Sequence, residues 1–533
     1  MVYRNLLVIG LLWLPQAIHQ LLGWIYWWQV KEYRLDRIKV FLSTKTGRRN
    51  LGIHFILLKL LSIFIAMFLS IPSLTLLVLV FTDIASLREA LRRQLRKPVF
   101  TQRAINIFST SWFLVLFGIF TGTIYFQSLL EAFLLSELAL ILGFIIGVGW
   151  TSLVSRYIRA AEIKKARQRL LKIKPIVIGV TGSYGKTSTK EFIAHLLSLR
   201  FNVAKTEGSQ NTEFALARTA IIIPEDTDFF VVEMGAYRKG EIKSLAEIVN
   251  PDIGVLTGIE PQHISLFGSL QNILDTKFEL IEALPPTGIA VFNLSNVYCR
   301  KLYDKAKMRS GRLRLMGYNV YGQAEKDIFV SKIVSSRAGE IHFIIDDGES
   351  KYKIITPLLG EHFVENLTAA IMIARQFNIS WKEIKEGCKN LPRIEKRMEI
   401  SNVKGAIIID DSFNASPKSF AAAVKYLDFF KDRIKVIVTA GVIELGRDSS
   451  RIHRDLGKLM SKRVDEIILL DEDPYEDILA GLGKQKDLQI SVINNPGQAI
   501  KRIEEVLEKR AVLLLEGKIP SLINELIEKN KNA

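Results

Sequence analysis

The stretch from Pro175 to Leu199 constrains the fold more than any other part of the chain. It begins with an apolar run, Ile176 to Val180, that has the length and composition of a buried strand. A glycine-spaced turn, GSYGKT, follows, and after it comes a helical pattern of apolar residues. A strand, a glycine-rich loop and a helix N-terminus together form an anion site, because free backbone N–H groups and the helix dipole point at the loop. The stretch therefore predicts a phosphate-binding loop.

The residue types in this loop indicate a nucleoside triphosphate. Lys186 would reach the outer phosphates, and the Thr187 hydroxyl group would ligate Mg²⁺. The loop is a variant, because the standard pattern has a glycine five residues before Gly185 and this chain has Val180 there. The predicted phosphate cradle also includes Gly182, Ser183 and Ser188.

Positive charge is concentrated in the first 174 residues. The chain of 533 residues carries 72 Lys+Arg and 55 Asp+Glu. Residues 1–174 hold 23 of the basic and 7 of the acidic side chains, so the other 359 residues are almost neutral, with 49 basic and 48 acidic ones. A nucleic-acid binder carries a basic stripe on its folded domain. The distribution argues against a nucleic-acid partner and favours a membrane region.

Four apolar segments lie within the basic region: Leu6–Trp28, Leu60–Phe81, Ala104–Phe126 and Ala132–Val154. Each has the length of the roughly 20 apolar residues that cross a bilayer. The first segment lacks a small-residue cleavage site and ends in tryptophans, which suits a membrane interface and not a cleaved signal peptide. Residues 1–174 are therefore predicted to be a helical transmembrane region in contact with the lipid bilayer.

The basic loops predict the orientation of this region. Eight Lys and Arg lie between residues 156 and 174, directly before the phosphate-binding domain. These cations and ATP both place that side in the cytosol, so we expect cytoplasmic catalytic domains on a multi-pass protein of the inner (plasma) membrane. The loop Lys31–Arg49 carries seven more cations, which four simple crossings would place on the other side. Either one of the first two segments is re-entrant or in the membrane plane, or the positive-inside rule fails here.

After Lys174 apolar strands alternate with helical patterns. Strands are predicted at Phe229–Glu233, Ile253–Thr257 and Ile289–Asn293. This alternation predicts a mostly parallel sheet, whose ligands gather at the carboxyl ends of the strands. Four polar residues fall at or after such ends: Thr187, Glu233, His263 and Asn293.

These residues belong to an ordered series of motifs that resembles the Mur ligases. The series is TGSYGKTSTKE, TEGSQNTEFALA, VVEMGAYRKGEI, NPDIGVLT, HISLFGSLQNILDTKFE, LLGEHFVENLTAA, RIEKRMEI, IIIDDSFNASPKSFAAA and AGVIELG. Within the family it is most similar to the branch that adds D-alanyl-D-alanine to UDP-N-acetylmuramoyl-tripeptide. The resemblance implies an α/β fold with a P-loop central ATP-binding domain at 175–392 and a Rossmann-like C-terminal α/β domain at 393–533. In that domain strands are predicted at Ala406–Ile409, Val436–Ala440, Glu466–Leu470 and Val512–Leu515.

The resemblance also implies roles for individual residues. Glu233 would complete the shell of one Mg²⁺ with a hard oxygen, and His263 would ligate a second. Lys277 stands where some members carry a carbamylated lysine, whose carboxylate can hold magnesium, and Asn293 would lie on the adenine side. Further contacts are implied for the nucleotide by Arg397 and Asp410, and for the substrates by Asn211, Asn414 and Ser416.

The residues alone leave simpler alternatives open. Glu233 could pair with Arg238 or Lys239 at the surface, His263 could be an ordinary loop histidine, and Lys277 could be an ordinary helix-surface lysine. The chain also departs from the family, which usually has Asn after the Ile253–Thr257 strand, where Gly258 stands. It likewise usually has Asn in place of Ser416 and Tyr in place of Phe413.

The expected chemistry is ATP-dependent amide-bond formation with Lys186, Lys277 and His263 as catalytic residues. A substrate carboxylate attacks the γ-phosphorus, and an amine displaces phosphate from the resulting acyl phosphate. The resemblance implies a cell-wall peptide precursor as the product, extended by D-alanyl-D-alanine or another amino acid or dipeptide. The branch carries an N-terminal UDP-sugar-binding domain, for which residues 155–174 leave no room. Two alternatives stay open: a ligase for a membrane-linked non-muramyl substrate, and an inactive membrane-anchored nucleotide-binding regulator.

Overall fold

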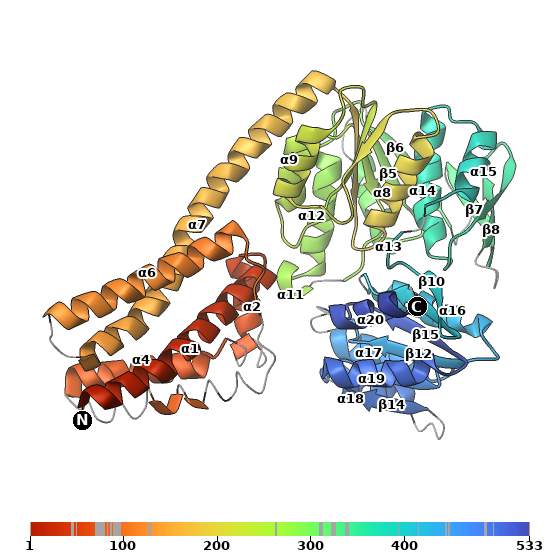
Figure 1. Cartoon of the computed structure of the whole chain (residues 1–533). Helices are drawn as coiled ribbons and strands as arrows, with labels where there is room; N and C mark the ends of the chain where they lie inside the picture. Colours follow the sequence, from red (N-terminus) through yellow and green to blue (C-terminus); the bar gives the residue numbers. More distant parts are fainter. Residues whose placement is uncertain are drawn as a thin grey trace. The chain divides into compact units, whose positions relative to one another are not determined.

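A computed structural model gives the fold of most of the chain. It describes residues 2–43, 47–48, 51–69, 80–82, 84–85, 88, 97–125, 129–261, 264–308, 313–320, 327–335, 340–392, 394–413, 415–442, 445, 448–483, 488–493 and 495–531. The chain forms two compact units, Met1–Ala161 and Glu162–Ala533, and each is described by itself (Figure 1).

The first unit is helical. The core of this unit contains Trp13, Ala17 and Leu21 of its first helix, together with Ile107 and Leu140 of two later helices. Residues four apart share one face of a helix, so the first helix buries a continuous stripe against the others. The helices of this unit are α1 (Val2–Val30), α2 (Leu35–Ser43), α4 (Ile53–Leu69), α6 (Gln102–Tyr125) and the first part of α7 (Leu129–Ile173).

Helices α6 and α7 approach each other closely at glycines. A Cβ atom added at Gly143 of α7 would lie 2.6 Å from the Cα atom of Ser111 on α6. A Cβ atom added at Gly122 of α6 would lie 2.5 Å from the Cα atom of Ala132 on α7. No side chain fits at these distances, so the two backbones are in direct contact, as in membrane helix pairs with small residues at the interface.

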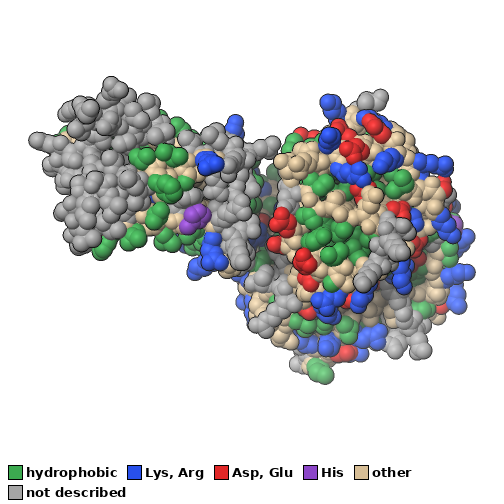
Figure 2. Space-filling model, turned by 90° about the horizontal axis from the view of Figure 1, so that it is seen from below, with side chains coloured by type: hydrophobic (Ala, Val, Ile, Leu, Met, Phe, Trp, Pro, Cys, Tyr) green, Lys and Arg blue, Asp and Glu red, His purple; other side chains and the backbone are tan. Residues whose placement is uncertain are grey.

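Two helical segments of the chain, Gln102–Ile124 and Leu135–Ile173, are long and apolar enough to cross a membrane, by length and composition. They overlap the third and fourth predicted segments. The side chains of residues 6–12 in the first predicted segment, and all of residues 70–79 in the second, lie outside what the structure describes. Figure 2 shows apolar side chains at the surface of the described part of this unit.

The second unit begins with a nine-stranded sheet in the order β2-β3-β1-β4-β5-β6-β7-β8-β9. Neighbours from β2 to β7 are parallel, and β8 is antiparallel to β7 and β9. The predicted mostly parallel sheet is confirmed, and the antiparallel part was not predicted. The strands are β1 (Ile176–Thr181), β2 (Val203–Lys205), β3 (Phe229–Glu233), β4 (Ile253–Leu256), β5 (Ile289–Asn293), β6 (Arg314–Asn319), β7 (Ile328–Ser335), β8 (Ile341–Asp346) and β9 (Lys351–Thr356).

Helices cover both faces of this sheet (Figure 1). Successive strand residues point to opposite faces, so Ile178 of β1 packs with α8 and α14 while Val177 packs with α9, α10, α12 and α13. Polar caps set the helix starts: the Ser269 hydroxyl accepts from the Asn272 N–H, and Ser380 forms a capping box with Glu383. The helices are α8 (Lys186–Leu197), α9 (Glu213–Ile222), α10 (Glu241–Val249), α11 (Ile264–Phe267), α12 (Leu270–Glu282), α13 (Val297–Lys307), α14 (Phe363–Gln376) and α15 (Trp381–Lys389).

A six-stranded sheet follows, in the order β10-β11-β15-β12-β13-β14. Its first pair is antiparallel and the others are parallel. The four strands predicted for this domain are present as β11, β12, β13 and β15. The strands are β10 (Glu399–Val403), β11 (Ala406–Asp411), β12 (Ile434–Thr439), β13 (Glu466–Leu469), β14 (Gln489–Val492) and β15 (Ala511–Glu516).

Helices also flank this second sheet, and they complete the α/β fold predicted from the sequence. On the surface of this unit seen in Figure 2, Lys and Arg side chains are interspersed with Asp and Glu. The helices are α16 (Pro417–Tyr426), the short 3₁₀ turn η1 (Leu427–Phe429), α17 (Ser449–Met460), α18 (Tyr475–Leu482), α19 (Pro496–Leu507) and α20 (Ser521–Lys531).

The contact between α6 and α7 gives a test with a matched control on the same helix. Gly143→Ala places a methyl group against Ser111, and we expect overpacking to cost about 1–3 kcal/mol. Nothing lies within 4 Å of a Cβ atom at Gly149, so Gly149→Ala should keep or raise stability through helix propensity. Thermal unfolding of the detergent-solubilised chain measures both. Equal effects of the two substitutions would contradict the close contact.

Candidate functional site

The predicted phosphate-binding loop joins β1 to α8. Gly185 precedes the helix with a φ angle of 77°, in the left-handed region that favours glycine. A Cβ atom there would also lie 2.4 Å from Oδ1 of Asn366 on α14. Lys186 Nζ donates to the carbonyl oxygens of Gly182 (2.9 Å) and Ser183 (3.2 Å). The loop therefore has the conformation and the lysine position of a phosphate cradle.

A buried carboxylate at the end of β3 faces this loop. Thr187 Oγ1 donates to Oε2 of Glu233 at 2.8 Å, and Asn211 Nδ2 donates to Oε1 of Glu233 at 3.0 Å. Glu233 is only 1% exposed, and Arg238 forms an ion pair with Glu241. The alternative in which Glu233 pairs with Arg238 at the surface is therefore wrong. The Thr187 hydroxyl group and the Glu233 carboxylate, which were expected to ligate the same Mg²⁺, are in direct contact.

Lys277 of α12 is also buried, at 3% exposure, so the alternative of an ordinary surface lysine is wrong. Burial lowers the pKa of Lys277 to about 7, and the positive charge of Lys186 lowers it further while nearby carboxylates oppose the shift. Burial also lowers the pKa of Lys186, and Glu233 opposes that shift. At neutral pH a large fraction of the Lys277 side chain is a neutral amine.

The donor set suits a hard cation. Thr187 and Glu233 offer oxygen ligands, which Mg²⁺ prefers. Among the described residues no group of three or more His, Cys, Asp or Glu side chains could hold a metal ion. Mg²⁺ sites of phosphoryl-transfer proteins commonly use one or two protein oxygens together with substrate phosphates, and the residues present fit that type.

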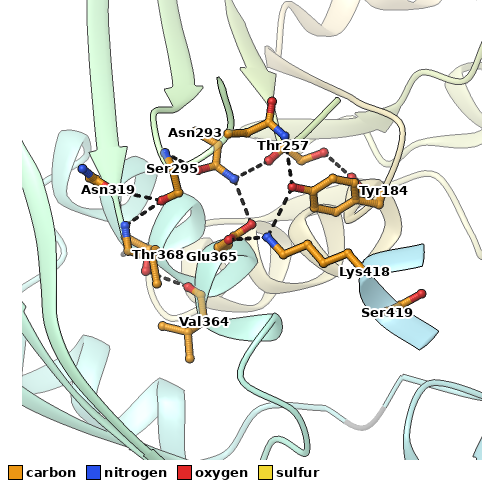
Figure 3. A network of polar contacts seen from close by, with 12 residues as sticks. Tyr184, Thr257, Asn293, Ser295, Asn319, Val364, Glu365, Thr368, Lys418 and Ser419 are labelled. Atoms are coloured by element: carbon orange, nitrogen blue, oxygen red, sulfur yellow. Dashed lines mark hydrogen bonds and ion pairs between the residues drawn. The ribbon is translucent and has the colours of Figure 1, made fainter. Parts of the chain in front are cut away.

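A second polar network contains Asn293, at the end of β5 (Figure 3). Asn293 Nδ2 donates to the Thr257 carbonyl oxygen (2.7 Å) and to Oε2 of Glu365 on α14 (3.0 Å). Lys418 Nζ of α16 lies 2.5 Å from Oε1 of the same carboxylate. Glu365 is therefore fully paired, although it is buried, and it links the nine-stranded sheet to a helix of the C-terminal domain.

Tyr184 belongs to this network and was not assigned from the sequence. Its hydroxyl group lies 3.4 Å from Asn296 Nδ2 and from Lys418 Nζ. A Cβ atom at Gly258 would lie 2.2 Å from Cζ of the tyrosine ring. The departure from the family at Gly258 thus has a steric reason, because the ring of Tyr184 occupies the space of a side chain at 258. Burial raises the pKa of Tyr184, so the phenol stays neutral.

Sequence reasoning missed Tyr184, Glu365 and Lys418, although each lies within a quoted motif. Their position within these motifs could have marked them as candidate site residues. Nothing in a single sequence, however, shows that residues 184, 365 and 418 are in contact. Glu260 is a further missed residue, and burial raises its pKa to about 7. Burial lowers the pKa of the missed residue His362 to about 3, and Lys418 and Arg397 lower it further.

The remaining predicted residues have varied surroundings. The Arg397 side chain is half-buried, and its guanidinium stacks 4.4 Å above the ring centre of Phe413; burial lowers its pKa. Asp410 Oδ1 accepts from the Ser412 N–H at 3.0 Å. The Ser416 hydroxyl accepts from the Ser419 N–H and caps α16. Three further predicted residues complete this account: Ser188 Oγ is buried and has no hydrogen-bond partner among the described residues, and His263 and Asn414 lie outside those residues.

A phosphate-binding loop, a buried strand-end carboxylate and a second α/β domain define a P-loop protein of two α/β domains. Residues 180–374 match the model of the Mur ligase middle domain, and residues 396–519 match that of the Mur ligase glutamate ligase domain. The two matches together cover more than half of the chain. The chain belongs to the Mur ligase family and carries these two domains.

Individual relatives agree with this assignment. The chain is 28% identical over 370 residues to the UDP-N-acetylmuramoyl-tripeptide–D-alanyl-D-alanine ligase of Bacillus subtilis, covering 68% of this chain and 78% of the relative. It is 30% identical over 312 residues to the ligase of that name from Synechocystis, covering 57% of this chain and 63% of the relative. The crystal structure of MurF ligase from Thermotoga maritima in complex with ADP superposes with a TM-score of 0.60 at 25% identity, covering 70% of this chain and 84% of that one.

The contact between Tyr184 and Gly258 predicts a rescue. Gly258→Ala forces a methyl group into the tyrosine ring, and we expect it to lower the free energy of unfolding by about 1–3 kcal/mol. In a Tyr184→Ala background the space is free, so the same substitution should cost little. Thermal unfolding and nucleotide affinity of the two single variants and the double variant measure the coupling. Additive effects would contradict the contact.

The low pKa of Lys277 predicts a pH dependence of stability. The pKa is about 7 in the folded chain and 10.5 for an ordinary lysine, so between these values the unfolded chain binds one more proton. The free energy of unfolding should therefore rise with pH in this window, by up to about 1.4 kcal/mol per pH unit. Lys277→Met should remove that slope. Melting temperatures in bicarbonate-free buffers from pH 7 to pH 10 test this, and parallel curves for the two proteins would contradict it.

Proposed function

We propose that the chain is an ATP-dependent amide ligase of the MurF type. It would join D-alanyl-D-alanine, or another amino acid or dipeptide, to a carboxylate of a cell-wall peptide precursor. The observation that carries the proposal is the contact of Thr187 with Glu233 beside Lys186. Support for the substrates comes from the activity of the two relatives named above, which match 68% and 57% of this chain.

The loop and strand-end residues would serve the phosphoryl transfer. Lys186 is placed to neutralise charge on the transferred group. Thr187 and Glu233 would hold one Mg²⁺, and His263 with a carbamylated Lys277 would hold a second. Bound there, Mg²⁺ would stabilise the charge that develops on the phosphoryl oxygens. The neutral amine of Lys277 supports carbamylation, because an uncharged amine is the form that reacts with carbon dioxide.

Residues of the C-terminal domain would complete the site. Arg397 would contact the phosphates and Asp410 the ribose, while Asn211 would approach the substrate. The ion pair of Lys418 with Glu365 supports a working arrangement in which α16 lies against the middle domain. Excluding water matters for this chemistry, because water would hydrolyse an acyl phosphate before the amine reacts. Roles of Asn293 at the adenine and of Ser416 and Asn414 at the substrate are part of the same proposal.

The helical unit would hold the enzyme at the cytoplasmic face of a membrane. Only 22% and 28% of the two apolar windows in α6 and α7 are buried within the chain, which leaves large apolar faces for lipid. Within the unit, Lys59 Nζ and Trp13 Nε1 both donate to Oε1 of Glu137, at 2.6 and 2.8 Å. Such internal pairing is how charged side chains are accommodated at membrane depth. The domain limits 1–174, 175–392 and 393–533 belong to this proposal.

Phosphate release by washed membranes containing the full chain tests the function. Release should require ATP, a carboxylate precursor and an amine together, with a ligated product detected by mass spectrometry. Lys186→Ala should lower kcat at least 100-fold, whereas Lys239→Ala, at an exposed lysine of the turn before α10, should leave it unchanged. Nucleotide binding without turnover for any substrate pair would favour the regulator. Recovery of the activity in the soluble fraction after the membranes are washed would contradict the membrane attachment.

A further inference from the structure

Three helices of the helical unit are joined at one end of the unit. The side-chain amide of Gln29, near the end of α1, donates to the carbonyl oxygen of Val99 (3.0 Å) and accepts from its N–H (2.8 Å), just before α6 begins. Arg103, in the first turn of α6, donates from Nη2 to Oγ of Ser152 on α7 at 2.8 Å. The end of α1, the start of α6 and the middle of α7 therefore form one junction (Figure 1).

This junction has the composition of a membrane interface. Apolar residues follow Arg103 along α6 and precede Ser152 along α7, and the cations of α7 begin at Arg156. Tryptophan and tyrosine are enriched where a bilayer meets water. Such side chains flank the junction in the sequence: Trp27, Trp28, Tyr33, Trp150 and Tyr157. In a chain anchored by α6 and α7, the junction would lie at the level of the lipid headgroups.

The Arg103 side chain is held in place, but its charge is not neutralised by the described residues. Its guanidinium group lies 4.1 Å from the ring centre of Tyr33. Its Nε atom is buried and has no hydrogen-bond partner in the described part of the chain. The charges that act on Arg103 there are those of Tyr33 and of Arg159, a second cation two turns after Ser152 on α7, and no carboxylate is among them. Because a half-buried cation without a counter-ion is costly, the surroundings of Arg103 favour a bound anion.

The acidic side chains nearest to Tyr33 in the sequence already have cationic partners. Glu32 pairs with Arg37 at 2.6 Å, and Asp36 pairs with Arg34 at 2.7 Å. These two carboxylates are therefore engaged elsewhere, and a ligand anion would supply the negative charge that they do not bring to Arg103.

Exposed apolar side chains adjoin the junction. Val99 and Phe100 directly precede the first turn of α6 and are 71% and 60% exposed, and Ile105 in that turn is also exposed. A cation beside exposed apolar surface suits an amphiphile, which has a charged group and a hydrocarbon part, better than it suits a free anion. The ligand chemistry that fits is a phosphate group with acyl chains attached.

We propose that Arg103 binds the phosphate group of an anionic membrane phospholipid, with Arg159 beside it and an acyl chain along Val99 and Phe100. This inference rests on the membrane attachment in the proposed function and names the lipid class that the attachment uses. The planar guanidinium group matches the geometry of phosphate oxygens. Anionic lipids of the cytoplasmic leaflet attract Lys and Arg side chains next to membrane helices. A bound lipid would supply the counter-ion of Arg103 and stabilise the junction of α1, α6 and α7.

Native mass spectrometry of the full-length, detergent-solubilised chain tests the lipid site. The probe is dioleoylphosphatidylglycerol. It is compared with dioleoylphosphatidylcholine, whose headgroup has no net charge, and with glycerol 3-phosphate, which has the phosphate group but no acyl chains. We expect the anionic lipid to bind more tightly than either of the others. Arg103→Gln should weaken its binding about fivefold, the effect of one cation on an anionic lipid, whereas Arg103→Lys, which keeps the charge, should retain most of it. Circular dichroism and gel filtration show whether each variant is folded.

Arg167→Gln is the matched control, because it removes the same charge from an exposed arginine further along α7 and should leave lipid binding unchanged. Equal lipid binding by wild type and a folded Arg103→Gln variant would overturn the proposal. An equal effect of Arg167→Gln would also overturn it, since net charge alone would then explain the binding. Displacement of the lipid by an equal concentration of glycerol 3-phosphate would assign the site to a free phosphate and overturn the lipid assignment.

The lipid site and the ligase activity can fail separately. Lipid binding that depends on Arg103, without phosphate release from ATP, would support the lipid site and contradict the proposed ligase. Ligase turnover with equal lipid binding by wild type and Arg103→Gln would contradict the lipid site alone.

Discussion

The hydrogen bond between Thr187 and Glu233 depends on the position of β1 between β3 and β4. Parallel neighbours end at the same edge of a sheet, so the loop after β1 and the carboxylate that ends β3 meet there. Asn211 fixes the second oxygen of Glu233, and the carboxylate is held in one orientation. Lys186 and Lys277 then lie within electrostatic range of this carboxylate. Glu233 raises the pKa of both lysines and so opposes the lowering of their pKa by burial.

Two buried acidic sites in the second unit contrast with each other. Glu365 receives hydrogen bonds from Asn293 and Lys418, and removing one partner of such a pair typically costs about 3–5 kcal/mol. It behaves as a structural link between α14 and α16. Glu516 is equally buried, and burial together with the neighbouring Asp411 carboxylate raises its pKa well above the ordinary value.

The helical unit follows different physics from the catalytic domains. Its buried Glu137 is paired with Lys59 and Trp13, while large apolar side chains such as Phe113 are exposed. Glycines bring α6 and α7 together. In a bilayer, helices gain little from apolar burial and associate through close packing and internal hydrogen bonds. Two helical segments of this unit, Gln102–Ile124 and Leu135–Ile173, are by length and composition able to cross a membrane.

Local patterns in the sequence determined the strands and helices of the second unit and its phosphate-binding loop. Phe229–Glu233 and Ile289–Asn293 are strands to the residue, because continuous apolar runs between helical patterns have few other ways to be buried. The spacing of the glycines before Lys186 likewise predicts the phosphate-binding loop, because the conformation of that loop depends on residues that are neighbours in the sequence. Only the tertiary structure decided which distant residues meet. The ring of Tyr184 explains Gly258, and the register of β11 with β15 places Asp411 beside Glu516. Such contacts depend on strand order and on side-chain packing. The spacing of residues along one chain predicts neither.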